Sequence, residues 1–184
     1  MTNAPFLTTA RFDLWKPAAD DLHGLVRLLE GEDMTRFLGP ARADPFSQFE
    51  RLLRNAGSWA LHGYGIFYVR PRGEAEIIAS CGVFHSWRGF GKGMDDVAEA
   101  GWIVRQDHWG RGVAGEVMRA VLPWFDETRG KRRIACMIEA GNVASERLAA
   151  ALGFVWYDSQ VAEDDERAVL NLFERLPESA AEER

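Results

Sequence analysis

The sequence predicts a single mixed α/β domain built on a twisted central sheet. Short runs of β-branched and aromatic residues alternate with segments whose apolar residues recur at helical spacing. The chain has 184 residues, which is the size of one compact domain. Apolar residues make up 47% of it and charged residues 27%, so a core of ordinary globular composition can form.

The N-terminal half predicts strands and helices in a mixed order. The expected elements are a strand at 8–15, a helix at 19–30, a helix opening at Asp44, and strands at 66–69 and 77–84. The second helix is expected to begin there because aspartate is a good N-cap and Pro45 suits the first helical position. Its predicted apolar stripe is Phe49, Leu52, Leu53 and Ala56.

The C-terminal half continues the alternation. The expected elements are a strand at 97–104, a helix at 112–125, a strand at 133–138, a helix at 142–152, and strands at 155–157 and 169–174. Pro123 lacks a backbone donor and is expected to kink or shorten the end of its helix. Gly153 suits the position just after a helix. The complete order, β-α-α-β-β-β-α-β-α-β-β, indicates helices packed on a mixed sheet.

Composition argues against several classes of function. The net charge is −6, and no basic patch is evident, so we expect no nucleic-acid partner. The acidic balance suits an amine-bearing partner but also simply keeps a protein in solution. Residues 1–6 have no signal-peptide pattern, and no apolar stretch approaches membrane-spanning length. We therefore expect a cytoplasmic protein without membrane contact, and the sequence leaves a homodimer open.

The cysteines and histidines do not suggest a metal site. Cys81 and Cys136 lie in separate strand-like runs and form no CxxC pair, so they are expected to be buried, reduced thiols. The four histidines form no HxxxH or HExxH group. We expect no metal.

The most informative segment runs from 97 to 116. A strand leads into a turn with Gly110 and Gly112, and the turn leads into a helix. The first turn of a helix has unpaired N–H groups and partial positive charge, and glycines allow close backbone approach. This combination predicts a pyrophosphate-binding loop. The segment is neither GxxxxGK[ST] nor a GxGxxG motif after a first strand, which excludes a P-loop and does not favour a dinucleotide fold.

This loop resembles motif A of the GNAT acetyltransferases, which reads Gln/Arg-x-x-Gly-x-Gly/Ala. The chain has Trp109-Gly110-Arg111-Gly112-Val113-Ala114, with Trp109 in place of the usual Gln or Arg, a departure frequent in the RimJ/RimL-like branch. Asn142-Val143-Ala144-Ser145 and Leu152-Gly153-Phe154 resemble motif B, and residues 7–14 resemble the first strand of that branch. The resemblance covers nearly the whole chain.

The resemblance implies a GNAT fold of about seven strands and about four helices, splayed between the fourth and fifth strands. Residues 1–176 would form one acetyltransferase domain and 177–184 a flexible tail. The implied activity transfers acetyl from acetyl-CoA to a primary amine, at a protein N-terminus or on a small molecule. A non-catalytic acyl-CoA-binding module on the same fold is the alternative, because fold alone does not decide function.

The resemblance also assigns the cofactor contacts. Main-chain groups of Trp102, Ile103 and Val104 would pair with pantetheine, and the loop Trp109, Gly110, Arg111, Gly112, Val113 and Ala114 would hold the pyrophosphate. Asn142 would hydrogen-bond the pantetheine arm or act as a helix N-cap, and Ser145 would lie beside it.

Glu99 is the candidate general base, because a carboxylate in an apolar strand is costly unless it is paired or functional. A solvent-facing glutamate and one paired with arginine are the alternatives. Ala149 stands where many members of the family have a tyrosine that acts as the general acid, so Ser145 is the candidate for this role. The alternatives are that Ser145 only bonds a backbone carbonyl and that solvent supplies the proton. Four rings are candidates for the acceptor cleft: Trp59, Trp87, Phe90 and Trp102.

Overall fold

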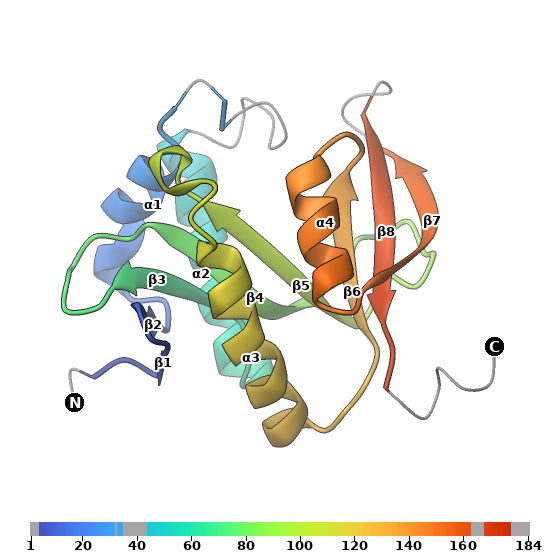
Figure 1. Cartoon of the computed structure of the whole chain (residues 1–184), viewed down its shortest axis with the longest axis horizontal. Helices are drawn as coiled ribbons and strands as arrows, with labels where there is room; N and C mark the ends of the chain where they lie inside the picture. The colour runs from blue at the N-terminus through green and yellow to red at the C-terminus, as the bar shows by residue number, and fades with distance from the viewer. Residues whose placement is uncertain (1–3, 32, 35–43, 163–167, 178–184) are drawn as a thin grey trace.

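The computed structural model describes residues 4–31, 33–34, 44–162 and 168–177. They form an eight-stranded sheet with the order β1-β2-β3-β4-β5-β6-β8-β7, as Figure 1 shows. The strands are β1 (Leu7–Thr8), β2 (Phe12–Trp15), β3 (Ile66–Pro71), β4 (Ala79–Ser86), β5 (Val97–Val104), β6 (Ile134–Glu139), β7 (Val155–Val161) and β8 (Val169–Arg175). All neighbouring strands are antiparallel except β5 and β6, which are parallel.

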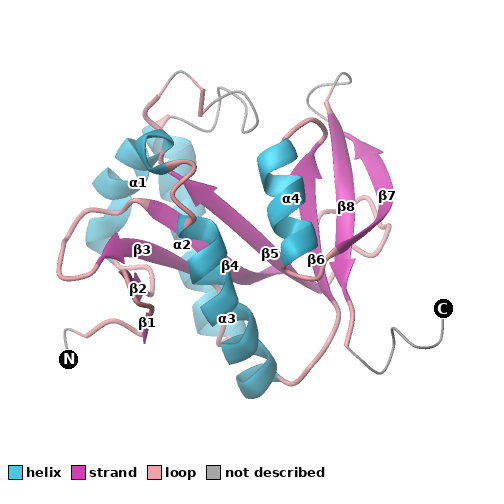
Figure 2. Ribbon diagram, viewed as in Figure 1, coloured by secondary structure: helices cyan, strands magenta, loops and turns pink. Residues whose placement is uncertain are grey.

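Helices cover both faces of the sheet. They are α1 (Leu22–Leu28), α2 (Pro45–His62), α3 (Val113–Arg129) and α4 (Val143–Ala151). Figure 2 shows α3 and α4 on the near face, and α1 and α2 on the far face. The alternation of β3 explains the two layers, since successive strand residues point to opposite faces. Phe67 packs in the α3 layer with Val117, whereas Tyr68 packs in the α1 layer with Leu25.

The sheet opens between β5 and β6. These strands pair only from Ala98↔Ile134 to Ala100↔Cys136, although β5 continues to Val104 and β6 to Glu139. The remaining halves diverge, with α3 and α4 flanking the opening in Figure 1. The predicted splay between the fourth and fifth strands is confirmed, at strands numbered β5 and β6 because an extra strand precedes them.

The extra strand comes from a turn inside the first predicted strand. Residues 8–15 form no single strand; β1 and β2 instead make a hairpin in which Leu7 faces Leu14. Thr9 causes the reversal, since its Oγ1 accepts from Phe12 N–H at 3.0 Å and its N–H donates to Phe12 C=O at 2.8 Å. The predicted helix at 19–30 is also shorter, with a 3₁₀ turn (Ala19–Asp21) before α1.

Helix α2 begins as predicted but buries another face. Asp44 Oδ1 accepts from the N–H groups of Phe46 and Ser47 at 3.0 and 3.1 Å. The predicted stripe is wrong at Phe49, which is 46% exposed, and at Leu53, which is 55% exposed, whereas Leu52 is buried and Ala56 is half-buried. The buried face is largely polar: Gln48, Leu52, Asn55, Ser58 and Trp59.

Hydrogen bonds explain this face. Asn55 Nδ2 donates to Tyr68 Oη at 3.1 Å, and Ser58 Oγ donates to Tyr64 C=O at 2.8 Å. Polar groups that find partners can be buried without penalty, which an apolar period does not reveal. Likewise α3 continues past Pro123 to Arg129, so the proline does not shorten the helix as expected.

The remaining structural predictions concern the thiols, the membrane and the tail. Cys81 and Cys136 are free and buried; burial raises the pKa of Cys81 to about 12 and raises that of Cys136 as well. Among the helices that the structure describes, none has the length and apolar composition needed to cross a bilayer. Residues 178–184 of the predicted tail lie outside the described residues, so the boundary at 176 stays a prediction.

Candidate active site

The loop between β5 and α3 has the conformation that its glycines predict. Gly110 and Gly112 have φ angles of 71° and 72°, in the left-handed region that glycine adopts without strain. Gly112 is the N-cap of α3 and provides no side-chain acceptor. The first bond of the helix joins Glu116 N–H to Gly112 C=O, so the N–H groups of Val113, Ala114 and Gly115 have no partner within α3. A row of donors therefore faces the loop.

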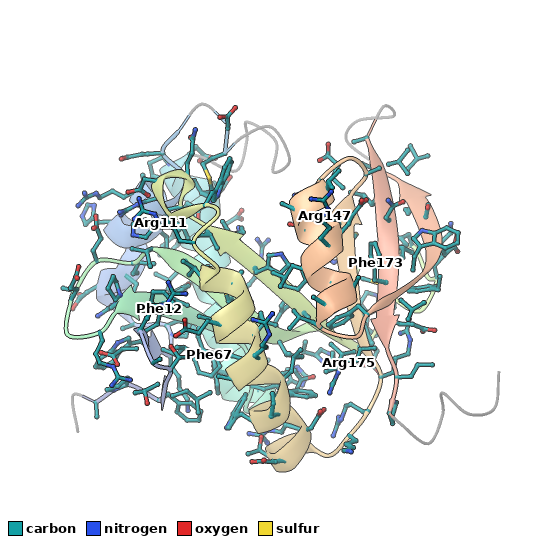
Figure 3. The ribbon with its side chains drawn as sticks, in the orientation of Figure 1. Phe12, Phe67, Arg111, Arg147, Phe173 and Arg175 are labelled. Atoms are coloured by element: carbon teal, nitrogen blue, oxygen red, sulfur yellow. The ribbon has the colours of Figure 1, made fainter. Side chains whose placement is uncertain are left out.

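Side-chain hydrogen bonds fix the segment that connects β5 to this loop. Trp109 Nε1 donates to Val104 C=O at 2.7 Å, which ties the loop to the end of β5. Arg105 Nε and Nη2 donate to Oδ1 and Oδ2 of Asp107 at 2.7 and 2.9 Å. These hydrogen bonds hold the pKa of Asp107 below its ordinary value. Arg111, within the loop, is exposed, and Figure 3 shows it on one side of the opening with Arg147 of α4 on the other.

Main-chain groups at the end of β5 line the opening. Trp102, Ile103 and Val104 pair with β4 on one side and lie beyond the last β5–β6 pair on the other. The edge of β5 that faces away from β4 can therefore pair with an extended ligand, which would lie in the sheet as an added strand. Of these groups, the carbonyl of Val104 already accepts from Trp109.

Glu99 lies one residue before the point where the strands part. Its side chain is buried, with 3% of the residue exposed, and both oxygens bind Arg88. Arg88 Nε donates to Oε2 at 2.9 Å and Nη2 donates to Oε1 at 2.5 Å. Burial alone would lower the pKa of Arg88, but the bond and charge of Glu99 outweigh it and raise that pKa. Of the alternatives for Glu99, the pairing with arginine is present and exposure to solvent is not.

Sequence reasoning missed Arg88 as the partner. It lies in the glycine-rich loop between β4 and β5, which Asp95 stabilises by accepting from Gly89 N–H at 2.5 Å and Gly91 N–H at 2.8 Å. The available signal was a lone arginine at the start of a loop that leads back to the strand of Glu99.

Asn142 and Ser145 meet at the start of α4. Asn142 Oδ1 accepts from Ser145 N–H at 3.1 Å, so its side-chain oxygen acts as the helix N-cap. Trp102 Nε1 donates to Ser145 Oγ at 3.3 Å and bridges β5 and α4 across the opening. The alternative of a serine bonded to a backbone carbonyl is absent from the hydrogen bonds of the described residues.

Comparison with known proteins identifies this arrangement. Residues 11–155 match the acetyltransferase (GNAT) domain family, and this match spans both the loop and α4. The chain belongs to the GNAT acetyltransferase family. Members of the family use acetyl-CoA, which is therefore the acyl donor of this acetyltransferase.

Known proteins are similar to this chain over most of its length. The uncharacterized N-acetyltransferase YoaA of Bacillus subtilis (strain 168) is 25% identical over 151 residues, which are 82% of each protein. A GnaT-family acetyltransferase from Bordetella pertussis is 30% identical with a TM-score of 0.81, over 92% of this chain and 98% of that one. The ribosomal-protein-S5-alanine acetyltransferase of Vibrio fischeri shares the fold at 15% identity, with a TM-score of 0.73 over 94% and 96%.

The site of this GNAT acetyltransferase fits acetyl-CoA. A Cβ at Gly110 would meet nothing within 4 Å, and one at Gly112 would meet only Arg11 Nη2 at 3.8 Å, so the space before the loop is open. The free amides and the positive end of α3 suit a diphosphate. Gly115 joins this set of donors, although sequence reasoning stopped at Ala114.

Two of the rings predicted for the acceptor cleft lie in different surroundings. Trp59 is a core residue packed against Phe6, Phe67 and Trp124, which corrects its assignment to the acceptor cleft. Trp87 is 72% exposed. No cluster of three or more histidine, cysteine or acidic side chains that could hold a metal occurs in the described part of the chain.

Proposed function

We propose that this acetyltransferase acetylates primary amines, at a protein N-terminus or on a small molecule, with Glu99 as general base and Ser145 as general acid. One observation carries the proposal: the two groups lie on opposite faces of the sheet beside the opening. Glu99 shares its face of β5 with Ile103, which packs in the α1 layer, whereas Trp102 packs in the α3 layer and bonds Ser145.

This placement suits direct attack of an amine on a thioester. The amine can enter from the face of Glu99 while the thiol departs on the face of Ser145. Acetyl-CoA supplies the activated acetyl group. Glu99 receives the proton that leaves the amine nitrogen, and Ser145 supplies the proton that joins the sulfur. One C–N bond forms as one C–S bond breaks, and solvent restores both side chains.

Paired with Arg88, Glu99 still has sites for an acceptor amine, and we infer that α-amines are the preferred acceptors. A carboxylate has about four lone-pair sites, and Arg88 uses two of those on Glu99. The remaining sites can hold an ammonium group or a water. An α-amine titrates near about 7.7–8.0 and a lysine near about 10.4, so the α-amine needs less help to lose its proton. The similar fold of two ribosomal-protein acetyltransferases, RimL and the Vibrio fischeri protein, supports a RimJ/RimL-like acceptor by analogy.

A thiol-release assay over a panel of acceptors tests the proposal. The panel includes peptides with free or blocked N-termini, lysine side chains, small amines and aminoglycosides. We expect release of CoA with free N-terminal peptides and none with blocked ones. Glu99→Gln should bind CoA normally but lose turnover by about 10²-fold or more.

Glu174→Gln is the matched control. Glu174 is also a buried strand glutamate, and Arg133 Nε donates to it at 2.6 Å, but it lies on β8, two strands from β5, and not on either strand that borders the opening. It should change stability without a comparable loss of turnover. Normal turnover by Glu99→Gln, or CoA binding without transfer to any amine of the panel, would contradict the proposal.

A further inference from the structure

The turn between β1 and β2 touches the phosphate-binding loop from the other end of the chain. Thr9 and Arg11 of this turn reach Glu116 in the first turn of α3, although more than a hundred residues separate them. Building on the cofactor site proposed above, we propose that Arg11 and Glu116 are positioning residues that orient the loop for the diphosphate of acetyl-CoA.

We call the hydrogen bonds among Thr9, Arg11, Glu116 and the carbonyl of Arg111 the clasp. Glu116 is its central acceptor. Its Oε1 accepts from Thr9 Oγ1 at 2.7 Å and from Arg11 N–H at 3.0 Å, and its Oε2 accepts from Arg11 Nε at 2.6 Å. Burial would raise the pKa of Glu116, but the bonds from Thr9 and Arg11 outweigh it and hold that pKa below its ordinary value. With Glu116 held, the guanidinium of Arg11 has one orientation.

That orientation extends the clasp to the loop. Arg11 Nη1 donates to Arg111 C=O at 3.0 Å. In a trans peptide the C=O and the following N–H point in opposite directions. The bond from Arg11 therefore also directs the N–H of Gly112 away from Arg11.

The loop needs such a restraint because of its glycines. Arg111 lies between Gly110 and Gly112, which both have positive φ and lack a Cβ. Glycine reaches many conformations at little cost, so the peptides of an unrestrained loop can rotate. Holding one carbonyl removes this freedom before the ligand arrives, and preorganisation of this kind increases affinity. The clasp should thus act on binding of the diphosphate and not on binding of the pantetheine arm.

Binding of two probes by the full-length protein separates these effects. CoA has the diphosphate, and pantetheine lacks it. Arg11→Met removes the donors of the side chain and, with the guanidinium, its contact over the ring of Phe12, while it keeps an unbranched apolar stem. We expect its Kd for CoA to rise about tenfold, as for loss of a charge-assisted hydrogen bond, while its Kd for pantetheine changes less than about twofold. Arg11→Lys can keep the charge pair with Glu116 but not both contacts, and should be intermediate.

Asp126→Asn is the matched control. Arg175 of β8 binds Asp126 through two bonds of 3.2 and 2.6 Å, which also join α3 to a segment remote in the sequence, but near the far end of that helix. This variant should leave the Kd values for CoA and pantetheine unchanged. Equal losses for CoA and pantetheine in Arg11→Met would show that the clasp only supports the fold, and unchanged binding would show that the loop is oriented without it.

A second measurement does not depend on ligand or turnover. Amide ¹⁵N relaxation of Gly110 and Gly112 in the free protein should report greater mobility in Arg11→Met than in the wild type. If the wild type did not bind CoA, the cofactor assignment would fail, and this comparison would still decide the role of the clasp. Unaltered relaxation at both glycines would overturn it.

Discussion

The indole N–H of Trp102 donates to Ser145 Oγ, with 3.3 Å between nitrogen and oxygen. Tryptophan is only a donor, so the serine oxygen must accept. Within the described residues, no hydrogen bond uses the Ser145 hydroxyl as donor. In the role proposed for Ser145, its proton would therefore be available to the leaving thiolate, and the bond from Trp102 would stabilise negative charge on the oxygen as the proton leaves.

Trp102→Phe tests this relationship. The change removes the donor and keeps an aromatic ring, so kcat should fall about 3- to 10-fold, as for one lost neutral hydrogen bond, with little change in the Kd for CoA. Ser145→Ala should lose more. In the Ser145→Ala background, Trp102→Phe should have no further effect on kcat.

Trp59→Phe provides the control for that experiment. Trp59 Nε1 donates to Ile66 C=O at 2.8 Å in the core. Its loss should lower Tm and leave kcat unchanged. Additive losses in the Trp102–Ser145 cycle would show that Trp102 acts independently of Ser145.

Arg88→Met should strongly destabilise the protein. Its side chain is 30% exposed but that of Glu99 is only 4% exposed, so the variant leaves a buried carboxylate unpaired. We expect the free energy of unfolding to fall by about 3 kcal/mol, measured by urea denaturation. The double variant Arg88→Met/Glu99→Met should recover much of this loss, because it removes the unpaired charge. A loss that persists in the double variant would indicate that Arg88 stabilises the loop by other contacts.

Gly110→Ala should impair the cofactor site more than the fold. The residue has φ of 71° and open space around it, so the added methyl should cost about 1–2 kcal/mol of backbone strain and would stand where we expect the diphosphate to bind. The Kd for CoA should therefore rise by more than about tenfold. Gly73→Ala is the control, since φ is 76° there and the space is also open. Equal CoA binding by the two variants would argue against the loop as the phosphate site.

Lowering the pH should remove the stabilising contribution of Glu116. Its folded-state pKa lies below the ordinary 4.5, so its contribution is present above that value and is lost as pH falls through the folded-state pKa. Urea denaturation at a series of pH values should therefore show a smaller acid-induced loss for Glu116→Gln than for the wild type. Parallel curves for the two proteins would show that the clasp contributes no net stabilisation.

Features that depend on neighbours in the chain could be predicted from the sequence. Asp44 and Pro45 predicted the start of α2, and the glycines predicted a turn at Gly110 and Gly112, because caps and turns form between residues a few positions apart. The resemblance of residues 97–116 and of the start of α4 to two GNAT motifs predicted the splay, which the structure confirms. It also assigned the cofactor loop, which stays a prediction.

Contacts between distant segments were decided only by the tertiary structure. The sequence marked Glu99 as an unusual carboxylate in an apolar strand, but folding paired it with Arg88. It placed residues 8–15 in one strand, whereas Thr9 and Arg11 leave the sheet to hold Glu116. Local periodicity and capping act over a few residues, while these pairs exist only after the sheet has brought remote segments within hydrogen-bonding distance.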